Sequence, residues 1–91
     1  MKIIQSGAFR RKVKKLNPRQ KRQLDEAIRI IMKNPVVGVK KKGDLKSVYI
    51  HKFYIDNMLY LLAYAFSEGQ IELIMLGPHE NYYSSLKSYL K

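Results

Sequence analysis

The sequence predicts an α+β domain in which a helical hairpin packs on a small, twisted, mostly antiparallel sheet, with a further helix at the C-terminus. Three observations favour this class. Apolar residues recur at helical spacing in two consecutive segments, which Asn17-Pro18 separates and Asn34-Pro35 ends. From Ser47 onward the pattern changes to β-forming runs divided by short turns, and Gly77-Pro78 breaks the last run. The expected order is β-α-α-β-β-β-α, within one domain over residues 1–91.

The first two elements are a short strand and a basic helix. Residues 2–5 are expected to form the strand, and Ser6 suits the N-cap of the helix. Phe9, Val13 and Leu16 follow at i, i+4 and i+7, so they lie on one stripe of this helix. Lysine and arginine fill most of the positions between them, which leaves a narrow apolar stripe on a basic surface.

The second helix has signals at both ends. Asn17 is a favourable N-cap, Pro18 is tolerated in the first turn, and Gln20 completes a capping box. Asn34-Pro35 ends the helix, and residues 35–46 are predicted to be a loop. The apolar stripe of this helix is predicted to comprise Leu24, Ala27, Ile28 and Ile31.

Three strands and a last helix are predicted for the rest of the chain. Residues 48–54 are rich in β-formers, and Asp56-Asn57 suits a hairpin turn because both residues tolerate positive φ. Residues 58–66 are apolar at successive positions, which is typical of a central strand covered on both faces. Residues 71–75 complete the meander, and the segment from Glu80 onward can form a helix.

The basic residues are concentrated in the first part of the chain. Eighteen lysines and arginines against seven aspartates and glutamates give a net charge of +11. Residues 1–56 hold 16 of the basic and four of the acidic residues, a net charge of +12, whereas the remainder has a net charge of −1. This asymmetry favours a polyanionic partner, and a solvated, solubilising face is the alternative. The side chains that we expect to contact phosphates are Lys14, Lys15, Arg19, Lys21, Arg22 and the run Lys40, Lys41 and Lys42.

Several function classes lack their sequence features. The chain has no cysteine, which excludes disulfides, thiolate zinc sites and a cysteine nucleophile. It has no P-loop, no dinucleotide fingerprint and no HExxH motif, and two histidines without a carboxylate cluster argue against a metal site. We therefore expect neither a cofactor nor a metal. No apolar run approaches the roughly 20 residues of a membrane span, so we expect a cytoplasmic protein without a membrane partner.

The remaining polar residues suit the cleavage of a phosphodiester. Cutting RNA without a metal needs a base for the 2′-hydroxyl, cations for the phosphorane and an acid for the leaving 5′-oxygen. His79 is the strongest candidate because it follows Gly77-Pro78 at the expected start of the last helix, although a surface histidine that caps this helix is the alternative. The further candidates are His51, Lys52, Glu80, Tyr82 and Tyr83. His51 and Lys52 point to opposite faces of their strand, and a packed histidine is the alternative for His51.

Two tyrosine pairs are candidates for stacking on bases. Tyr60 and Tyr64 share one face of the expected central strand, where tyrosines at this spacing pack in a core or stack on bases. Tyr82 and Tyr83 cannot both face the core, so one of them should be exposed near His79.

The C-terminal third of the chain resembles a known family. Residues 59–64 (LYLLAY), 71–83 (IELIMLGPHENYY) and Leu86-Lys87 resemble the RelE/ParE superfamily of type II toxins, in particular the ParE-like toxin branch. Members of that branch close with a Gly-Pro-His-Glu-Asn-aromatic-Tyr segment. The resemblance implies the fold predicted above and a cytosolic toxin neutralised by an antitoxin encoded beside it. RelE-type members cut mRNA in the ribosomal A site without a metal, whereas ParE-type members inhibit DNA gyrase.

The resemblance also implies roles for single residues. Lys52 matches a lysine of the second strand, His79 falls where a late Arg or His lies, and Tyr83 matches the C-terminal tyrosine. Two positions depart from the RelE pattern. The third-strand arginine position holds Tyr60, and the other second-strand lysine position falls near Ile50 or His51.

The leading hypothesis is a ribosome-dependent mRNA endoribonuclease that inhibits translation. The departures from the RelE pattern, and the absence of any arginine after Arg29, favour the alternative of a DNA gyrase inhibitor without nuclease activity. A non-toxic basic module that binds nucleic acid is a third hypothesis. The expected partners are the ribosome and mRNA, or DNA gyrase, and a cognate antitoxin with an acidic or amphipathic segment.

Overall fold

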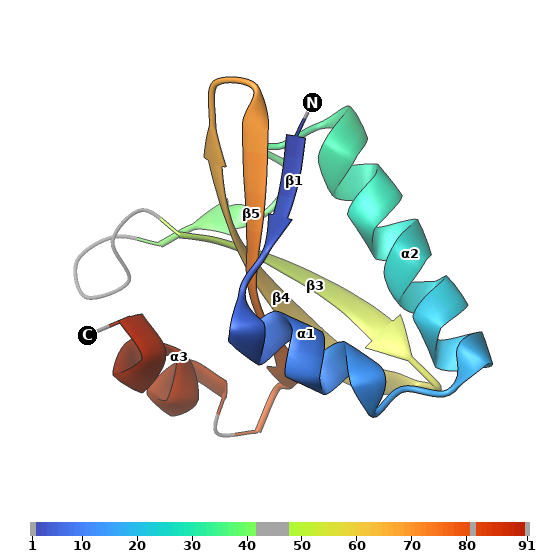
Figure 1. Ribbon diagram of the computed structural model, residues 1–91. Coiled ribbons are helices and arrows are strands. Elements are labelled where there is room, and N and C mark those ends of the chain that lie inside the picture. Colours follow the sequence, from blue (N-terminus) through green and yellow to red (C-terminus); the bar gives the residue numbers. More distant parts are fainter. Residues whose placement is uncertain (1, 42–47, 81, 91) are drawn as a thin grey trace.

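The computed structural model describes residues 2–41, 48–80 and 82–90 (Figure 1). Its elements are β1 (Lys2–Gln5), α1 (Gly7–Lys14), α2 (Pro18–Lys33), β2 (Val39–Lys40), β3 (Tyr49–Ile55), β4 (Met58–Ser67), β5 (Gln70–Pro78) and α3 (Tyr82–Leu90). Within these residues the strands form one sheet in the order β1-β5-β4-β3-β2, in which β1 is parallel to β5 and the other neighbours are antiparallel. The predicted α+β class is confirmed. None of the described helices is long and apolar enough to cross a membrane.

The strand β2 is the element that the sequence pattern did not predict. We expected a loop over residues 35–46, but Val39 pairs with Ile50 and Lys40 pairs with Tyr49 at the edge of the sheet. A strand of two residues is too short to show alternation in its own sequence, because its position is set by the strand beside it. The last part of the predicted loop lies outside the described residues.

The predicted starts of α1 and α2 are confirmed by their capping hydrogen bonds. The Ser6 hydroxyl accepts a hydrogen bond from the Phe9 amide and donates one to the carbonyl of Ile74 on β5. At α2, the Asn17 side chain accepts from the Gln20 amide at 2.8 Å, and the Gln20 side chain accepts from the Asn17 amide at 3.0 Å. The first helix is thereby fixed to the sheet, and the second begins with the predicted capping box.

The turn between β3 and β4 is fastened to the beginning of α2. Asp56 and Asn57 have φ angles of 50° and 67°, as expected for a two-residue hairpin turn. The Asp56 carboxylate accepts hydrogen bonds from the side chains of Gln20 and Gln23 and pairs with Arg19 at 2.9 Å. The hydrogen bond from Gln20 is the main cause that lowers the pKa of Asp56 below its ordinary value. The hydrogen bond from Gln23 and the charge of Arg19 lower this pKa further.

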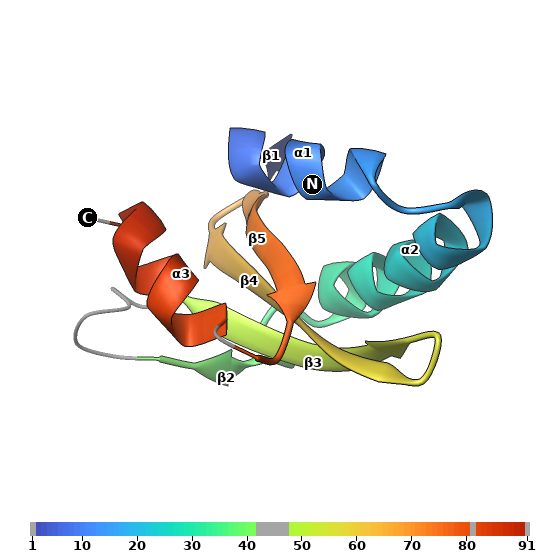
Figure 2. The same ribbon diagram turned by 90° about the horizontal axis from the view of Figure 1, so that it is seen from below.

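The strand β4 separates two apolar cores because its successive side chains point to opposite faces. Leu62 and Tyr64 belong to the core beneath α1 and α2, whereas Leu61 and Ala63 belong to the core beneath α3, with Leu86. The helix α1 packs against β5 and α2 against β3, and Figure 2 shows α2 and α3 on opposite sides of the sheet. We call these sides the hairpin face and the α3 face. The prediction of a central strand covered on both faces is confirmed.

The hydroxyl of Tyr64 joins the central strand to the segment that leads into β2. This fully buried side chain donates a hydrogen bond to the Pro35 carbonyl at 2.8 Å and accepts one from the Gly38 amide at 3.1 Å. Its ring stacks on Tyr49 with 5.4 Å between the ring centroids. A Cβ atom at Gly38 would lie 2.8 Å from the Ile50 carbonyl oxygen, so this close approach requires glycine. Tyr64 is therefore a core residue that braces β2.

Candidate functional site

Three side chains from distant segments meet on the α3 face. The Nζ atom of Lys41 lies 5.4 Å from the centroid of the Tyr83 ring. The ring of His79 meets the same ring edge to face, with 6.3 Å between the centroids and an interplanar angle of 87°. The end of β2, the end of β5 and α3 thus bring together an ammonium, an imidazole and a phenol. We call Lys41, His79 and Tyr83 the Tyr83 cluster.

Backbone hydrogen bonds hold two members of the cluster in place. The His79 amide donates to the Leu59 carbonyl at 3.1 Å, and the His79 carbonyl accepts from the Tyr82 amide at 3.2 Å. The Lys41 amide donates to the Val48 carbonyl at 2.7 Å. The side chain of His79 is exposed. The imidazole therefore faces solvent from a backbone that is fixed on both sides.

The two adjacent tyrosines of α3 have different environments. Tyr82 is only 4% exposed, and its hydroxyl donates to the Met75 carbonyl at 2.7 Å. Its ring covers Gly77, where an added Cβ would lie 3.4 Å from Tyr82 Cδ1. Burial raises the pKa of Tyr82 far above its ordinary value. The expected contact of Tyr82 with RNA is therefore corrected, because the buried ring is an anchor for α3 and Tyr83 is the accessible member near His79.

Lys52 shares the α3 face with the Tyr83 cluster. On β3 it is paired with Leu61, which in turn is paired with Gly77 beneath the ring of Tyr82. Lys52 is exposed, and so is Glu80, the residue after His79. In the described part of the chain, no three side chains of the types His, Cys, Asp or Glu lie close enough together to hold a metal ion.

His51 and Tyr60 lie on the hairpin face, away from this cluster. The His51 ring stacks on the ring of Phe53 with 5.9 Å between the centroids. The rings of Phe53 and Tyr60 pack at a tilt, with 6.4 Å between their centroids. Burial lowers the pKa of His51, and its Nε2 atom is buried without a hydrogen-bond partner among the described residues. His51 and Lys52 point to opposite faces of the strand, as predicted. His51 and Tyr60 therefore lie on the other side of the sheet from the site in which we expected them.

The basic side chains of α1 surround an open hollow. Its volume is about 520 Å³, and Met75 and Leu76 of β5 are among the residues that line it. It is also lined by Ala8, Arg11, Lys12 and Lys14 of α1 and by Lys15, the C-cap of this helix. Lys14 and Lys15, which we expected to contact phosphates, are both exposed here. This surface therefore presents four cations along one helix.

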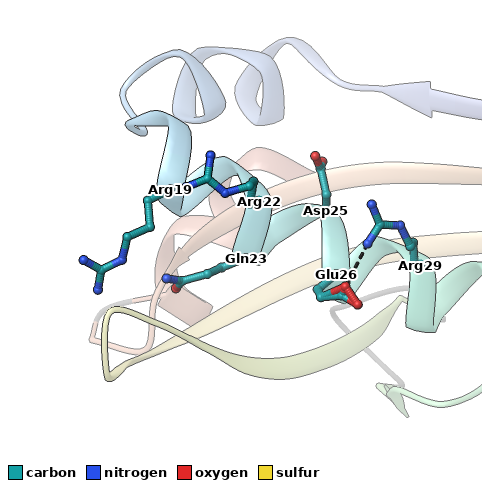
Figure 3. A pocket seen from close by; sticks show the side chains of 6 residues that line it. All are labelled: Arg19, Arg22, Gln23, Asp25, Glu26 and Arg29. Carbon is teal, nitrogen blue, oxygen red and sulfur yellow. Dashed lines mark hydrogen bonds and ion pairs between the residues drawn. The ribbon is translucent and has the colours of Figure 1, made fainter.

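The surface of α2 mixes basic and acidic side chains (Figure 3). A second hollow is lined by Arg19, Arg22, Gln23, Asp25, Glu26 and Arg29. Arg19 is paired with Asp56 at 2.9 Å, and Arg29 is paired with Glu26 at 2.7 Å. Of the expected phosphate contacts on α2, Arg19, Lys21 and Arg22 are all exposed, and Arg19 also pairs with Asp56.

The lysine run after α2 divides between the two faces of the sheet. Lys40 extends over the ring of Tyr49 on the hairpin face, with its Nζ atom 5.9 Å from the centroid. Lys41 extends over Tyr83 on the α3 face, and Lys42 lies outside the described residues. The sequence pattern did not distinguish these lysines, because only the pairing of β2 with β3 decides which one faces Tyr83.

Comparisons with known proteins agree with this architecture. A double mutant of the E. coli toxin RelE in the free state has a TM-score of 0.72 at 18% identity, covering 98% of this chain and 92% of that chain. The intact E. coli RelBE toxin-antitoxin complex gives a TM-score of 0.68 at 18% identity, with 87% and 96% covered. The YoeB/ParE toxin from Agrobacterium tumefaciens gives 0.63 at 17% identity, with 87% and 99% covered. A comparison with curated proteins finds no match.

These structural likenesses, at 17–18% identity, show the fold. The family model described as "ParE-like toxin of type II bacterial toxin-antitoxin system" matches residues 3–87, which is nearly the whole chain. The predicted resemblance is thereby confirmed. By this match, the chain belongs to the ParE-like toxins of type II bacterial toxin-antitoxin systems.

Proposed function

We propose that this toxin is a metal-independent, ribosome-dependent mRNA endoribonuclease that inhibits translation in the cytoplasm and arrests growth. The observation that carries the proposal is the Tyr83 cluster, which holds an imidazole, a phenol and an ammonium on one face of the sheet. Lys52 lies on the same face. These groups suit the attack of a 2′-hydroxyl on the neighbouring phosphodiester.

In the proposed reaction, the 2′-oxygen attacks phosphorus and the bond from phosphorus to the 5′-oxygen breaks. The products are a 2′,3′-cyclic phosphate and a 5′-hydroxyl. His79 takes the proton of the 2′-hydroxyl or gives a proton to the leaving 5′-oxygen, and Glu80 is the candidate for the other transfer. Lys52 stabilises the charge of the phosphorane, and the ring of Tyr83 orients the nucleotide. Each proton transfer contributes roughly 10²–10⁴-fold to the rate.

The basic surface of the toxin positions the RNA in this proposal. Phosphates of the ribosomal RNA and the mRNA are held by exposed cations on α1, α2 and β2. The members expected in this role are Lys14, Lys15, Lys21, Arg22 and Lys40. Each contact between a cation and a phosphate releases counterions. The loss of one such cation therefore weakens binding and reduces the slope of log affinity against log salt concentration by about one.

We infer a cognate antitoxin with an acidic, amphipathic segment as the protein partner. A solved structure with the same fold is that of the intact E. coli RelBE toxin-antitoxin complex. In this chain, Met32 is 43% exposed and lies with Arg29 and Lys33 around a shallow hollow on α2. Val36 and Val37 are also exposed just after the helix. Apolar side chains beside cations are complementary to a helix with one apolar and one acidic face.

One observation favours the alternative of a DNA gyrase inhibitor. Tyr60 stands where the RelE pattern has an arginine, and its side chain packs on the hairpin face. The chain therefore has no cation at that position of β4. A gyrase inhibitor would stall supercoiling and leave mRNA intact, so a supercoiling assay without effect at toxin excess removes this alternative.

The test is induced expression of the toxin, with growth as one readout and primer extension on a reporter mRNA as the other. Wild-type protein is expected to arrest growth and to produce discrete cuts in translated message, and His79→Ala is expected to abolish both. His51→Ala is the matched control, because it removes the other imidazole from the opposite face. If both His79→Ala and Tyr83→Phe leave growth arrest intact, the site assignment is wrong. Arrest with intact message would favour gyrase inhibition, and normal growth would favour a non-toxic binding module.

A further inference from the structure

We infer that Lys41, and not its neighbour Lys40, supplies a cation that contacts the scissile phosphate. The inference rests on the proposed nuclease function and adds to it a substrate-contacting residue. The α3 face already holds the imidazole of His79 against the ring of Tyr83. A phosphorane carries more negative charge than the phosphodiester, so a fixed cation near it lowers the barrier.

The pairing of β2 assigns the two lysines to different faces. Consecutive side chains of a strand point to opposite sides of the sheet. Lys40, paired with Tyr49, extends over that ring on the hairpin face at 5.9 Å from Nζ to the centroid. Lys41 follows it and extends over Tyr83 on the α3 face at 5.4 Å. The two residues have the same charge and adjacent positions, but only Lys41 contacts Tyr83.

The backbone before Lys41 is held by contacts that do not involve substrate. The Tyr64 hydroxyl bridges the Pro35 carbonyl and the Gly38 amide, and the Lys41 amide donates to the Val48 carbonyl at 2.7 Å. These bonds fix the chain on both sides of β2 before RNA binds. A cation held in this way needs little reorganisation when charge develops on the phosphate, which is the condition for strong electrostatic stabilisation.

One ring connects the cation to the proton-transfer group. Tyr83 contacts Lys41 through its face and His79 edge to face. An ammonium over an aromatic face is stabilised while its three N–H donors remain available to anionic oxygens. A nucleotide bound against Tyr83 can therefore present its phosphate to the ammonium of Lys41 and to the imidazole of His79. In this arrangement Lys41 binds a non-bridging oxygen and His79 transfers the proton.

The competing explanation is that Lys41 only packs on Tyr83 and holds α3. Three variants separate the two explanations. Lys41→Met keeps a long apolar side chain over the ring but removes the charge, whereas Lys41→Arg keeps the charge. Lys40→Met removes an identical charge from the same strand on the other face.

The assay measures single-turnover cleavage of mRNA on programmed ribosomes over a range of toxin concentrations. It gives a saturated rate and an apparent affinity for each variant, and urea unfolding gives the stability of each protein. Lys41→Met is expected to lower the saturated rate by about 10²–10³-fold, the usual effect of removing one preorganised donor. Lys41→Arg is expected to restore most of that rate. Lys40→Met is expected to lower the apparent affinity only, by a few-fold.

Equal saturated rates for Lys41→Met and Lys40→Met would overturn the inference. It would also be overturned by a loss of rate in Lys41→Met that tracks a loss of stability and is not restored by Lys41→Arg, since that pattern indicates packing. If the wild-type protein cuts no message on ribosomes, the proposed nuclease function fails and the inference fails with it. That outcome is distinct, because it appears in the wild type before any variant is compared.

Discussion

Replacing Tyr64 with phenylalanine isolates the hydroxyl that braces β2. The substitution keeps the buried ring and its stacking on Tyr49, for which the centroid distance is 5.4 Å. It removes the hydrogen bond to the Pro35 carbonyl at 2.8 Å and the one from the Gly38 amide at 3.1 Å. The perturbation is therefore confined to two polar contacts between β4 and the segment before β2.

The expected loss of stability follows from the number and burial of these contacts. A hydrogen bond contributes about 0.5–1.5 kcal/mol net, and a buried polar group left without a partner costs about 1–3 kcal/mol. We therefore expect Tyr64→Phe to lower the free energy of unfolding by about 1–3 kcal/mol. In a domain of this length, each kcal/mol lowers Tm by roughly 4–8 °C.

The measurement is urea unfolding followed by far-UV circular dichroism at neutral pH. Tyr89→Phe is the matched control, because Tyr89 is 42% exposed on α3 and its change should stay within about 0.5 kcal/mol. The slope of free energy against urea should be the same for both variants, since the same surface is exposed on unfolding. If the midpoints of Tyr64→Phe and Tyr89→Phe coincide, the bracing role of the Tyr64 hydroxyl is refuted.

Three further predictions concern single positions. Gly38→Ala places a Cβ 2.8 Å from the Ile50 carbonyl oxygen, so a loss of about 1–3 kcal/mol is expected in the same unfolding assay, and unchanged stability would contradict the close approach. Burial lowers the pKa of His51 in the folded state below 6.5, the value expected for the unfolded chain. The unfolded chain therefore binds the proton more readily, so the contribution of His51 to stability is complete above pH 6.5 and is lost as the pH falls through the folded pKa. His51→Leu should therefore flatten the decline of Tm with acidification, and an unchanged decline would point to other groups. Met32→Glu should weaken neutralisation by the co-expressed antitoxin, whereas Met58→Glu, at a methionine that is 54% exposed on β4, should not; equal effects would argue against docking on α2.

Local signals predicted much of this fold. The caps at Ser6 and Asn17 and the turn at Asp56-Asn57 depend on residues within three positions of one another, so the sequence shows them directly. The short edge strand at Val39–Lys40 depends on hydrogen bonds to β3, more than eight residues further along the chain, and no local pattern encodes them.

The candidate site shows the same division. The opposite directions of His51 and Lys52 follow from strand alternation alone, and the sequence predicted them correctly. The burial of Tyr82 instead of Tyr83 depends on how α3 docks over Gly77, which the helical pattern left open. The contact of Lys41 with Tyr83 joins two segments through the sheet, so it required the structure.

The parallel pairing of β1 with β5 sets the order in which this toxin can be completed during synthesis. Lys2 is paired with Gln70, and the Ser6 hydroxyl bonds to Ile74 across 68 positions of the chain. The first strand therefore has no partner until most of the polypeptide has been translated, and closing so long a loop slows folding. Since α1 is capped at the same junction, the cations of that helix that line the open hollow take their final place late. A nascent copy therefore cannot complete its sheet until residues 70–78 have been synthesised.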